Sequence, residues 1–160
     1  MTEGKPTAIV VDDEQPLREL LADLLKSNGY STLTAADGEE ALKYFNNGRP
    51  TPHLLLTDVV MPKKRGDELI EALVGIQTQK PDFYVPVLIV TGRVPNEVDY
   101  QRMIENAKRL YNPQHKTLLE EKLKAEGMLD LDQFITLAKP FQIKEFIRRA
   151  GLIKDLYTQS

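Results

Sequence analysis

A short apolar run that ends on a single carboxylate places the strongest constraint on the fold of this chain. Residues 54–57 (LLLT) are apolar or β-tolerant, Asp58 follows directly, and Met61-Pro62 closes the stretch. A continuous apolar run bounded by turn signals is typical of a strand buried on both faces, as in a parallel sheet. An acid at the carboxyl end of such a strand lies where open α/β sheets bind ligands. We therefore expect Asp58 to be the functional centre.

Four other segments have the composition of short strands, and amphipathic stretches separate them. These strands are expected over residues 7–11, 31–36, 85–91 and 134–138. Strands that alternate with helices indicate βαβ units, a parallel sheet and right-handed crossovers. The sequence therefore predicts an α/β fold with a doubly wound sheet of five parallel strands in the order 2-1-3-4-5. We expect residues 1–160 to form one domain, because this length is ordinary for a single core.

Apolar residues recur at helical spacing in four of the intervening stretches. Pro16 suits the first turn of the first helix, and Asn28-Gly29 ends it. A second helix is expected over residues 38–46. The residues expected on the apolar sides are Leu17, Leu20, Leu21, Leu24 and Leu25 in the first helix, Ala41, Leu42 and Phe45 in the second, Leu69, Ile70, Leu73 and Val74 in the third, and Ile143, Phe146, Ile147 and Ala150 in the last.

The connection between the fourth and fifth strands is longer than one helix requires. Residues 92–132 contain a helical apolar stripe that ends at Asn112-Pro113, and Asn112 is a suitable N-cap for a second helix that stops at Gly127. We therefore expect an enlarged helical connection made of two helices. The first stripe consists of Val98, Met103, Ile104, Ala107, Leu110 and Tyr111, and the second helix carries Leu118, Leu119 and Leu123.

Polar residues stand at the carboxyl ends of the predicted strands. Asp12 and Asp13 follow the first strand, Asp58 follows the third, Thr91 ends the fourth and Lys139 follows the fifth. In the predicted order the first and third strands flank the topological switch point, where ligands bind. Three carboxylates brought together repel one another unless a cation intervenes, and hard oxygen ligands suit Mg²⁺. An aspartate can also attack phosphorus and form an acyl phosphate.

Five motifs in this order carry a resemblance to a known family. They are the acidic pair in AIVVDDE, DVVMP around Asp58, Gly66 further on, Thr91-Gly92, and KPF from Lys139. Each motif alone has an ordinary structural explanation, such as helix capping by the acidic pair or a turn at Asp58. Together they make the chain similar to a bacterial two-component response-regulator receiver domain, which is a CheY-like, flavodoxin-like fold. The resemblance covers nearly the whole chain except the middle of residues 92–132.

The resemblance implies how a phosphoryl group is handled. Asp58 would accept it from a sensor histidine kinase or a phosphotransfer protein, while Thr91 and Lys139 would each contact a phosphoryl oxygen. The peptide bond between Lys139 and Pro140 is cis in the family, a conformation that is otherwise rare. No turnover is expected beyond self-phosphorylation and self-dephosphorylation of Asp58, so the chain is not expected to be an enzyme.

The resemblance also implies a metal site. Asp13, Asp58 and the backbone carbonyl of Val60 would ligate Mg²⁺ directly, and Asp12 would act mainly through water. Val60 has a second consequence, because its side chain cannot orient an attacking water molecule. Arg93 stands where it can shield the phosphoryl group. We therefore predict slow loss of phosphate from Asp58.

Two departures from the family concern the output of the signal. The family usually carries an aromatic residue three positions before the lysine, where this chain has Thr136, and Phe134 lies two residues earlier on the same expected strand face. Receivers signal by protein–protein contact through the face formed by the fourth helix, the fifth strand and the last helix. The long connection enlarges this face. We favour a role for it in binding an unknown output protein or a second copy of the chain over a decorative insertion.

Composition and charge limit the alternatives. The net charge is −3, so the chain as a whole does not indicate direct nucleic-acid or membrane binding. It has no Cys, and no apolar run approaches the roughly 20 residues that span a membrane. We therefore expect a cytoplasmic protein. His53 and His115 have no partners at metal-ligand spacing and are expected to be packed or solvated.

Two other functions on the same fold stay open at this point. One is a Mg²⁺-dependent phosphohydrolase with an aspartate nucleophile, although Val60 stands where such enzymes usually carry an acid/base aspartate. The other is a binding module that needs no phosphorylation, although every expected polar residue is present.

Overall fold

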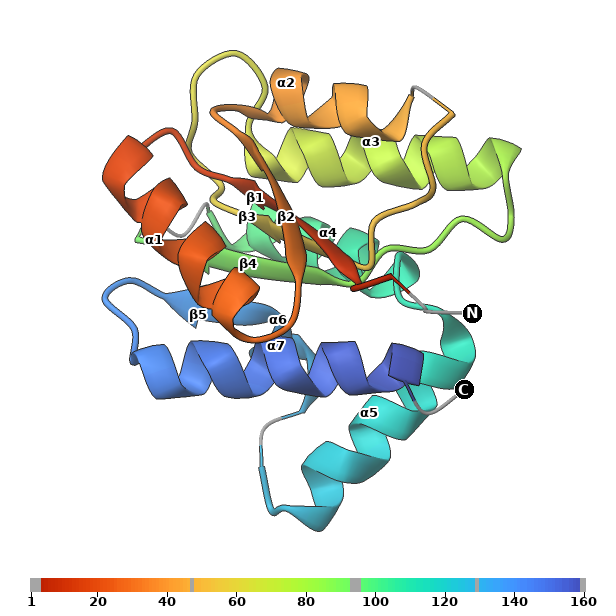
Figure 1. Ribbon diagram of the computed structural model, residues 1–160. Coiled ribbons are helices and arrows are strands. Elements are labelled where there is room, and N and C mark those ends of the chain that lie inside the picture. The colour runs from red at the N-terminus through yellow and green to blue at the C-terminus, as the bar shows by residue number, and fades with distance from the viewer. Residues whose placement is uncertain (1–3, 47, 93–95, 129, 159–160) are drawn as a thin grey trace.

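In the described part of the chain, five parallel strands form one sheet in the order β2-β1-β3-β4-β5, which confirms the predicted topology. The computed structural model describes residues 4–46, 48–92, 96–128 and 130–158. Helices cover both faces of the sheet (Figure 1), so the arrangement is the doubly wound, flavodoxin-like one. The strands are β1 (Thr7–Val11), β2 (Ser31–Ala35), β3 (Leu54–Thr57), β4 (Val87–Thr91) and β5 (Thr136–Ala138).

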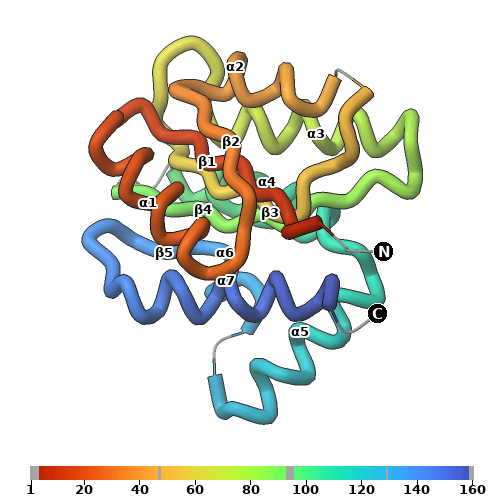
Figure 2. Tube along the Cα trace, in the orientation of Figure 1, coloured from red at the N-terminus to blue at the C-terminus, as the bar shows by residue number. Residues whose placement is uncertain are grey.

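The helices form two layers around this sheet. They are α1 (Gln15–Ser27), α2 (Gly38–Leu42), which continues into the 3₁₀ turn η1 (Lys43–Phe45), α3 (Gly66–Gln79), α4 (Glu97–Arg109), α5 (Pro113–Ala125), α6 (Leu131–Ile135) and α7 (Ile143–Thr158). α1 packs against α7 on one face, while α2, α3 and α4 pack side by side on the other. The Cα trace shows that both ends of the described chain lie opposite the loops that follow β1 and β3 (Figure 2). No described helix is long and apolar enough to span a bilayer.

The inner strands are buried on both faces. Every residue of β3 and β4 is buried, and in β1 only Thr7 is partly exposed. This burial explains why these segments are continuous apolar runs in the sequence. β2 is an edge strand, and Ala35 is its only buried residue. The polar residues that follow the inner strands are therefore held by the best-packed part of the molecule.

The fifth strand is shorter than the sequence predicts. Residues 134 and 135 belong to α6, so the expected strand over residues 134–138 is wrong for its first two positions. Asp130 starts the helical turn, because its side chain accepts a hydrogen bond from the Gln133 N–H. Phe134 is therefore a fully buried helical residue and does not share a strand face with Thr136.

The connection between β4 and β5 is enlarged, as predicted, but its described residues form three helices instead of two. Asn112 caps α5, because its side-chain oxygen accepts hydrogen bonds from the Gln114 and His115 N–H groups at 2.9 and 3.4 Å. The added third helix is α6. α5 packs against α7, and α6 packs against α4, β4 and β5. The connection thus widens the molecule beside the β5 edge (Figure 1).

Four apolar residues expected on the inner sides of their helices are exposed instead. In α1 the buried arc is centred on Leu21 and Leu25 and extends to Ala22, so that Leu20 lies outside it. Val98 and Ile143 stand in the first turns of α4 and α7. The exposed fractions are 46% for Leu20, 74% for Val98, 42% for Leu118 and 48% for Ile143.

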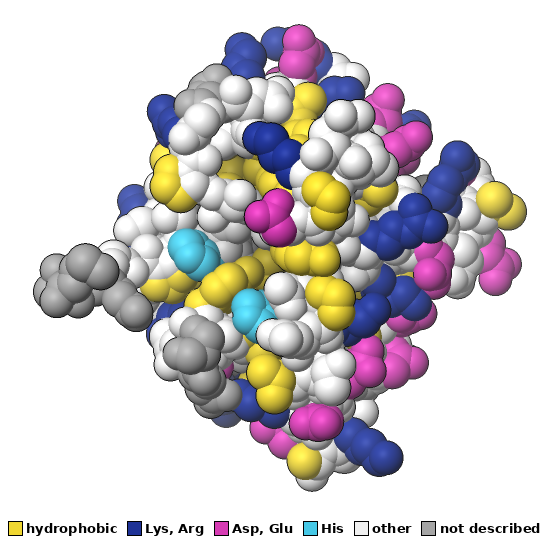
Figure 3. Space-filling model, turned by 90° about the vertical axis from the view of Figure 1, so that its right-hand side faces the viewer, with side chains coloured by type: hydrophobic (Ala, Val, Ile, Leu, Met, Phe, Trp, Pro, Cys, Tyr) yellow, Lys and Arg dark blue, Asp and Glu magenta, His cyan; other side chains and the backbone are white. Residues whose placement is uncertain are grey.

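An aromatic cluster lies where both ends of the described chain meet. Tyr157 of α7 contacts His53 and His115 edge-to-face, with ring centroids 4.7 and 5.0 Å apart. The Thr7 N–H donates to His53 Nδ1 at 3.0 Å. Figure 3 shows the two histidines on this side of the molecule, beside apolar side chains. The cluster joins the start of β1, the connection before β3, and helices α5 and α7.

Candidate functional site

The structure brings together the polar residues that the sequence places at the strand ends. Ligand oxygens of Asp12, Asp13 and Asp58 all lie within 4.8 Å of one another. Lys139 Nζ donates to both Asp12 Oδ2 and Asp58 Oδ2 at 3.0 Å. A cavity of about 260 Å³ opens above them, and Thr91 also lines it. Its lining residues are Asp13, Glu14, Asp58, Val60, Thr91, Gly92 and Lys139.

The three carboxylates differ in burial and in hydrogen bonding. Asp12 and Asp58 are buried, whereas Asp13 is exposed to solvent. Asp12 Oδ1 accepts a hydrogen bond from the Glu14 N–H at 2.9 Å. Asp58 Oδ1 accepts one from the Val59 N–H at 2.6 Å. Each buried carboxylate therefore has one oxygen held by the backbone and the other held by Lys139.

The charges at this site are not balanced. Three carboxylates against one ammonium leave an excess of two negative charges. Burial raises the pKa of Asp12, and the hydrogen bonds from Glu14 and Lys139 offset only part of this effect. Burial alone would lower the pKa of Lys139, but its bonds to Asp58 and Asp12 outweigh that and raise it. The cluster is therefore suited to a further cation.

The donor set fits Mg²⁺. All the candidate side-chain ligands are carboxylate oxygens, which are the hard ligands that this ion prefers, and the open cavity leaves room for its water molecules. Asp13 and Asp58 line the cavity together with Val60, the residue expected to offer a backbone carbonyl. Asp12 lies beneath them, hydrogen-bonded to Lys139.

A glycine lets α3 begin directly against the Asp58 loop. The Gly66 N–H donates to the Val59 carbonyl at 2.8 Å. A Cβ atom on Gly66 would lie 2.0 Å from the Asp58 carbonyl oxygen, which is backbone and cannot turn aside. Only glycine fits this approach, which gives the sequence motif a physical reason.

The β5 end of the site is tied to β4 by the backbone. The Lys139 N–H donates to the Thr91 carbonyl at 2.9 Å, and the bond between Lys139 and Pro140 is cis, as predicted. At the other end of β5 the hydroxyl groups of Thr136 and Tyr100 lie 3.3 Å apart. Phe134, by contrast, is buried in α6 and is not the strand residue that the sequence suggested.

Sequence reasoning missed two residues that support the site. Arg18 of α1 donates from Nη1 to the Asp12 carbonyl at 2.7 Å, and the Thr57 hydroxyl donates to the Asp58 carbonyl at 2.7 Å. An arginine on an amphipathic helix ordinarily faces solvent, so its sequence position alone gives no signal. Arg93, which the sequence suggested as a shield, lies outside the described residues.

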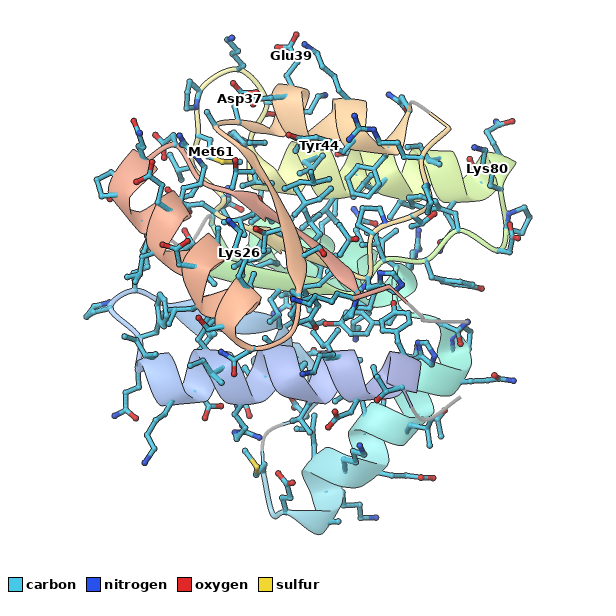
Figure 4. The ribbon with its side chains drawn as sticks, in the orientation of Figure 1. Lys26, Asp37, Glu39, Tyr44, Met61 and Lys80 are labelled. Carbon is cyan, nitrogen blue, oxygen red and sulfur yellow. The ribbon has the colours of Figure 1, made fainter. Side chains whose placement is uncertain are left out.

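Another buried acid near this edge does not belong to the cluster. Asp37 stands at the start of α2 (Figure 4), where its Oδ1 accepts a hydrogen bond from the Glu40 N–H at 2.8 Å. Its Oδ2 lies 3.9 Å from Lys63 Nζ. Asp37 is therefore a helix cap, and burial alone does not make an acid part of the site.

Comparisons with known proteins identify the family. The model of the response regulator receiver domain matches residues 8–111. Response regulator RR06 of Streptococcus pneumoniae serotype 2 is 33% identical over 149 residues, which cover 93% of this chain and 56% of that protein. Transcriptional regulatory protein CpxR of Escherichia coli is 36% identical over 85 residues, which cover 53% of this chain and 33% of that protein. The chain therefore spans only part of these relatives.

Solved structures agree with this assignment. The receiver domain of the Francisella response regulator 1452 has a TM-score of 0.61 at 25% identity, and the match covers 94% of this chain and 97% of that one. Chemotaxis response regulator CheY4 of Vibrio cholerae has the same fold, with a TM-score of 0.60 at 23% identity over 93% of this chain and 98% of that one. Because the family model covers well over half of the chain, the protein belongs to the response regulator receiver domain family of two-component signalling.

Proposed function

We propose that Asp58 accepts a phosphoryl group from the phosphohistidine of a sensor histidine kinase or a phosphotransfer protein. One observation carries the proposal: Asp58 shares Lys139 with Asp12 inside a cluster of three carboxylates that opens into a cavity. A carboxylate in this position is accessible to a substrate, and the Lys139 ammonium beside it can pair with the negative charge of a phosphoryl group.

The chemistry at Asp58 is an exchange of one bond for another. A carboxylate oxygen of Asp58 forms a bond to phosphorus as the bond between phosphorus and the donor nitrogen breaks. The leaving imidazole, protonated on its other nitrogen, keeps the electron pair and departs as neutral histidine. The Val59 N–H holds Oδ1 of Asp58 and so orients the carboxylate. The Lys139 ammonium and the Thr91 hydroxyl are donors of the kind that phosphoryl oxygens accept.

A divalent cation belongs to this proposal. Asp13 and Asp58 would hold Mg²⁺ together with the Val60 carbonyl, and Asp12 would act mainly through water. When bound, the ion would neutralise the excess carboxylate charge and the charge of the incoming phosphoryl group. The chain's own contribution is a set of oxygens that is already assembled before the phosphoryl group arrives.

In this proposal the phosphorylated protein signals by binding another protein and does not catalyse turnover of a substrate. Asp58 is modified once per molecule, and Val60 supplies no acid/base group for rapid hydrolysis. The contact surface is the face made by α4, β5 and α7, enlarged by α5 and α6. Its partner is an unidentified output protein or a second copy of the chain. We place the protein in the cytoplasm and assign it no direct nucleic-acid or membrane contact, in keeping with its net charge of −3.

Acetyl phosphate with Mg²⁺ tests the proposal without knowledge of the kinase. Intact-mass measurement should show one added phosphoryl group in the wild type and none in Asp58→Ala. The matched control is Asp37→Asn, which removes a different buried acid and should still be modified. Sustained release of phosphate from small phosphate esters would instead support a phosphohydrolase. Size-exclusion chromatography of the beryllofluoride-treated protein would separate a homodimer from a monomer that binds another protein.

A further inference from the structure

Arg18 binds the backbone between two acidic residues of the cluster, Asp12 and Asp13. Asp12 is the first residue after β1, and its N–H still joins the sheet through the Ala35 carbonyl at 3.1 Å. Its carbonyl oxygen instead accepts the hydrogen bond from Arg18 Nη1 at 2.7 Å. This bond spans six residues, from the second turn of α1 back to the strand end. Arg18 thereby fixes the peptide plane between Asp12 and Asp13.

The two acidic residues depend on this peptide to different degrees. The Asp12 side chain has restraints of its own, from the Glu14 N–H and from Lys139. The Asp13 side chain is exposed, and in the described part of the chain no hydrogen bond or ion pair holds it. The backbone sets the direction of its Cα–Cβ bond, and with it the positions that the carboxylate can reach. The peptide plane that Arg18 fixes therefore affects how readily the Asp13 carboxylate reaches the cluster.

We propose that Arg18 is a positioning residue for the divalent cation: by holding the Asp12 carbonyl it keeps the Asp13 carboxylate in the ligand cluster. The inference rests on the Mg²⁺ site of the proposed function and adds a residue to it. Residues behind the ligands of metal sites commonly affect affinity in this way, by factors of roughly 10 to 100.

The charge of Arg18 and its hydrogen bond should change Mg²⁺ affinity in opposite directions. Whether affinity rises or falls when Arg18 is replaced therefore shows which of the two dominates. The guanidinium is a cation, and its removal would strengthen Mg²⁺ binding if simple repulsion dominated. Removal would weaken binding if the fixed peptide dominated. Arg18→Ala removes both the charge and the hydrogen bond. Arg18→Lys keeps the charge and can still donate to one carbonyl, but its flexible stem fixes the peptide less well.

Mg²⁺ titrations without any phosphoryl donor test the inference. We expect the dissociation constant, followed by the backbone amide resonances around Asp13 and Val60, to rise about tenfold in Arg18→Ala. Arg18→Lys should lie between Arg18→Ala and the wild type. The matched control is Lys26→Ala, which removes a cation from the last turn of the same helix (Figure 4) and should leave the affinity unchanged. Urea unfolding in EDTA would show that every variant is folded.

The outcomes separate this inference from the proposed function. Equal or tighter Mg²⁺ binding by Arg18→Ala, with normal binding by the wild type, would overturn the role of Arg18 and leave the proposed function standing. Weaker binding by Arg18→Ala together with an equal loss in Lys26→Ala would also overturn it, because the effect would then be long-range charge. A wild-type protein that binds no Mg²⁺ would overturn the metal site itself, and the role of Arg18 with it.

Discussion

Asp58 lies in a cluster of like charges, which is an arrangement that costs stability. It shares Lys139 with Asp12, and Asp13 lies in the same cluster, so some repulsion between the carboxylates remains whenever no cation is bound. Asp58→Asn removes one negative charge and keeps both the size of the side chain and an acceptor for the Val59 N–H. We expect its free energy of unfolding, measured with urea in EDTA, to rise by about 1 kcal/mol.

The control for this measurement is Asp23→Asn. Asp23 is an exposed acid on α1, and its replacement should leave the free energy of unfolding unchanged. Mg²⁺ should then stabilise the wild type more than Asp58→Asn. A less stable Asp58→Asn would mean that the carboxylate is held favourably even without a cation.

On the proposed function, Val60 affects how long the phosphoryl group stays on Asp58. It lines the cavity, it is 40% exposed, and its side chain has no donor or acceptor. Val60→Asn introduces an amide that can orient a water molecule toward phosphorus. We expect loss of phosphate from the purified phosphoprotein to become about tenfold faster. An unchanged or slower rate would show that water is oriented by some other group.

The meeting of these polar residues at one edge of the sheet could be predicted from the sequence, and the contacts that support them could not. Asp12, Asp13, Asp58 and Lys139 follow strands whose apolar runs are easily recognised, and parallel strands deliver their carboxyl ends to one edge. Arg18 acts through a backbone carbonyl six residues away. Such a bond depends on the exact turn between strand and helix, which no residue pattern specifies.

At the scale of elements, α3 contains two glycines with opposite requirements. Gly66→Ala would place a methyl group 2.0 Å from the Asp58 carbonyl oxygen, so the helix start must move. We expect a loss of about 3 kcal/mol in the free energy of unfolding, together with slower phosphorylation of Asp58. At Gly75, in the same helix, an added Cβ atom would meet nothing within 4 Å. Gly75→Ala should therefore raise the free energy of unfolding by about 1 kcal/mol. Similar effects of the two variants would contradict the close approach at Gly66.

Arg149 joins α7 to the end of α6 and to β5. It is 5% exposed, and its Nη1 donates to the carbonyls of Gln133, Phe134 and Thr136 at 3.1, 3.0 and 2.8 Å. Arg149→Met should lower the free energy of unfolding by about 3 kcal/mol, because these carbonyls lose their donor. The neighbouring Arg148→Met is the control. Arg148 is a more exposed arginine that pairs with Glu145. Arg148→Met should lower the free energy of unfolding by no more than about 1 kcal/mol.

The same contact explains why β5 was predicted too long. Residues 134–138 (FITLA) are apolar or β-branched and fit a buried strand on propensity alone. Their first two residues are helical because Asp130 caps the turn from one side and Arg149 binds its carbonyls from the other. Arg149 lies more than ten residues away in the chain, so tertiary contacts override the local preference.

At the scale of the whole molecule, the aromatic cluster makes stability depend on pH. Burial lowers the pKa of His53 and of His115 below the ordinary 6.5. The unfolded chain therefore takes up protons first as the pH falls, so stability is full above that value and declines below it. Protonation also removes the acceptor for the Thr7 N–H at His53 and charges a ring at His115 whose buried Nδ1 has no partner among the described residues.

Urea unfolding at several pH values measures this effect. The free energy of unfolding of the wild type should fall by about 1 kcal/mol between about pH 7 and about pH 5.5. That of the double variant His53→Asn, His115→Asn should fall much less. Glu145 does not interfere, because its hydrogen bond with Arg148 lowers its pKa to about 2, so its stabilising contribution is lost only as the pH falls from 4.5 towards 2, below the range measured. The pKa of Asp12 is raised, so this residue favours the folded state as the pH falls, and it does so equally in the wild type and in the double variant. Parallel pH profiles would exclude the histidines as the cause.

The most direct measurement locates the phosphoryl group itself. The wild-type protein would be phosphorylated with acetyl phosphate and Mg²⁺ and then reduced with borohydride, which converts an aspartyl phosphate to homoserine. Peptide mass spectrometry should find homoserine at position 58 and at no other aspartate of the cluster. Homoserine at position 12 or 13, or unmodified Asp58 under conditions that phosphorylate another receiver domain, would contradict the assignment.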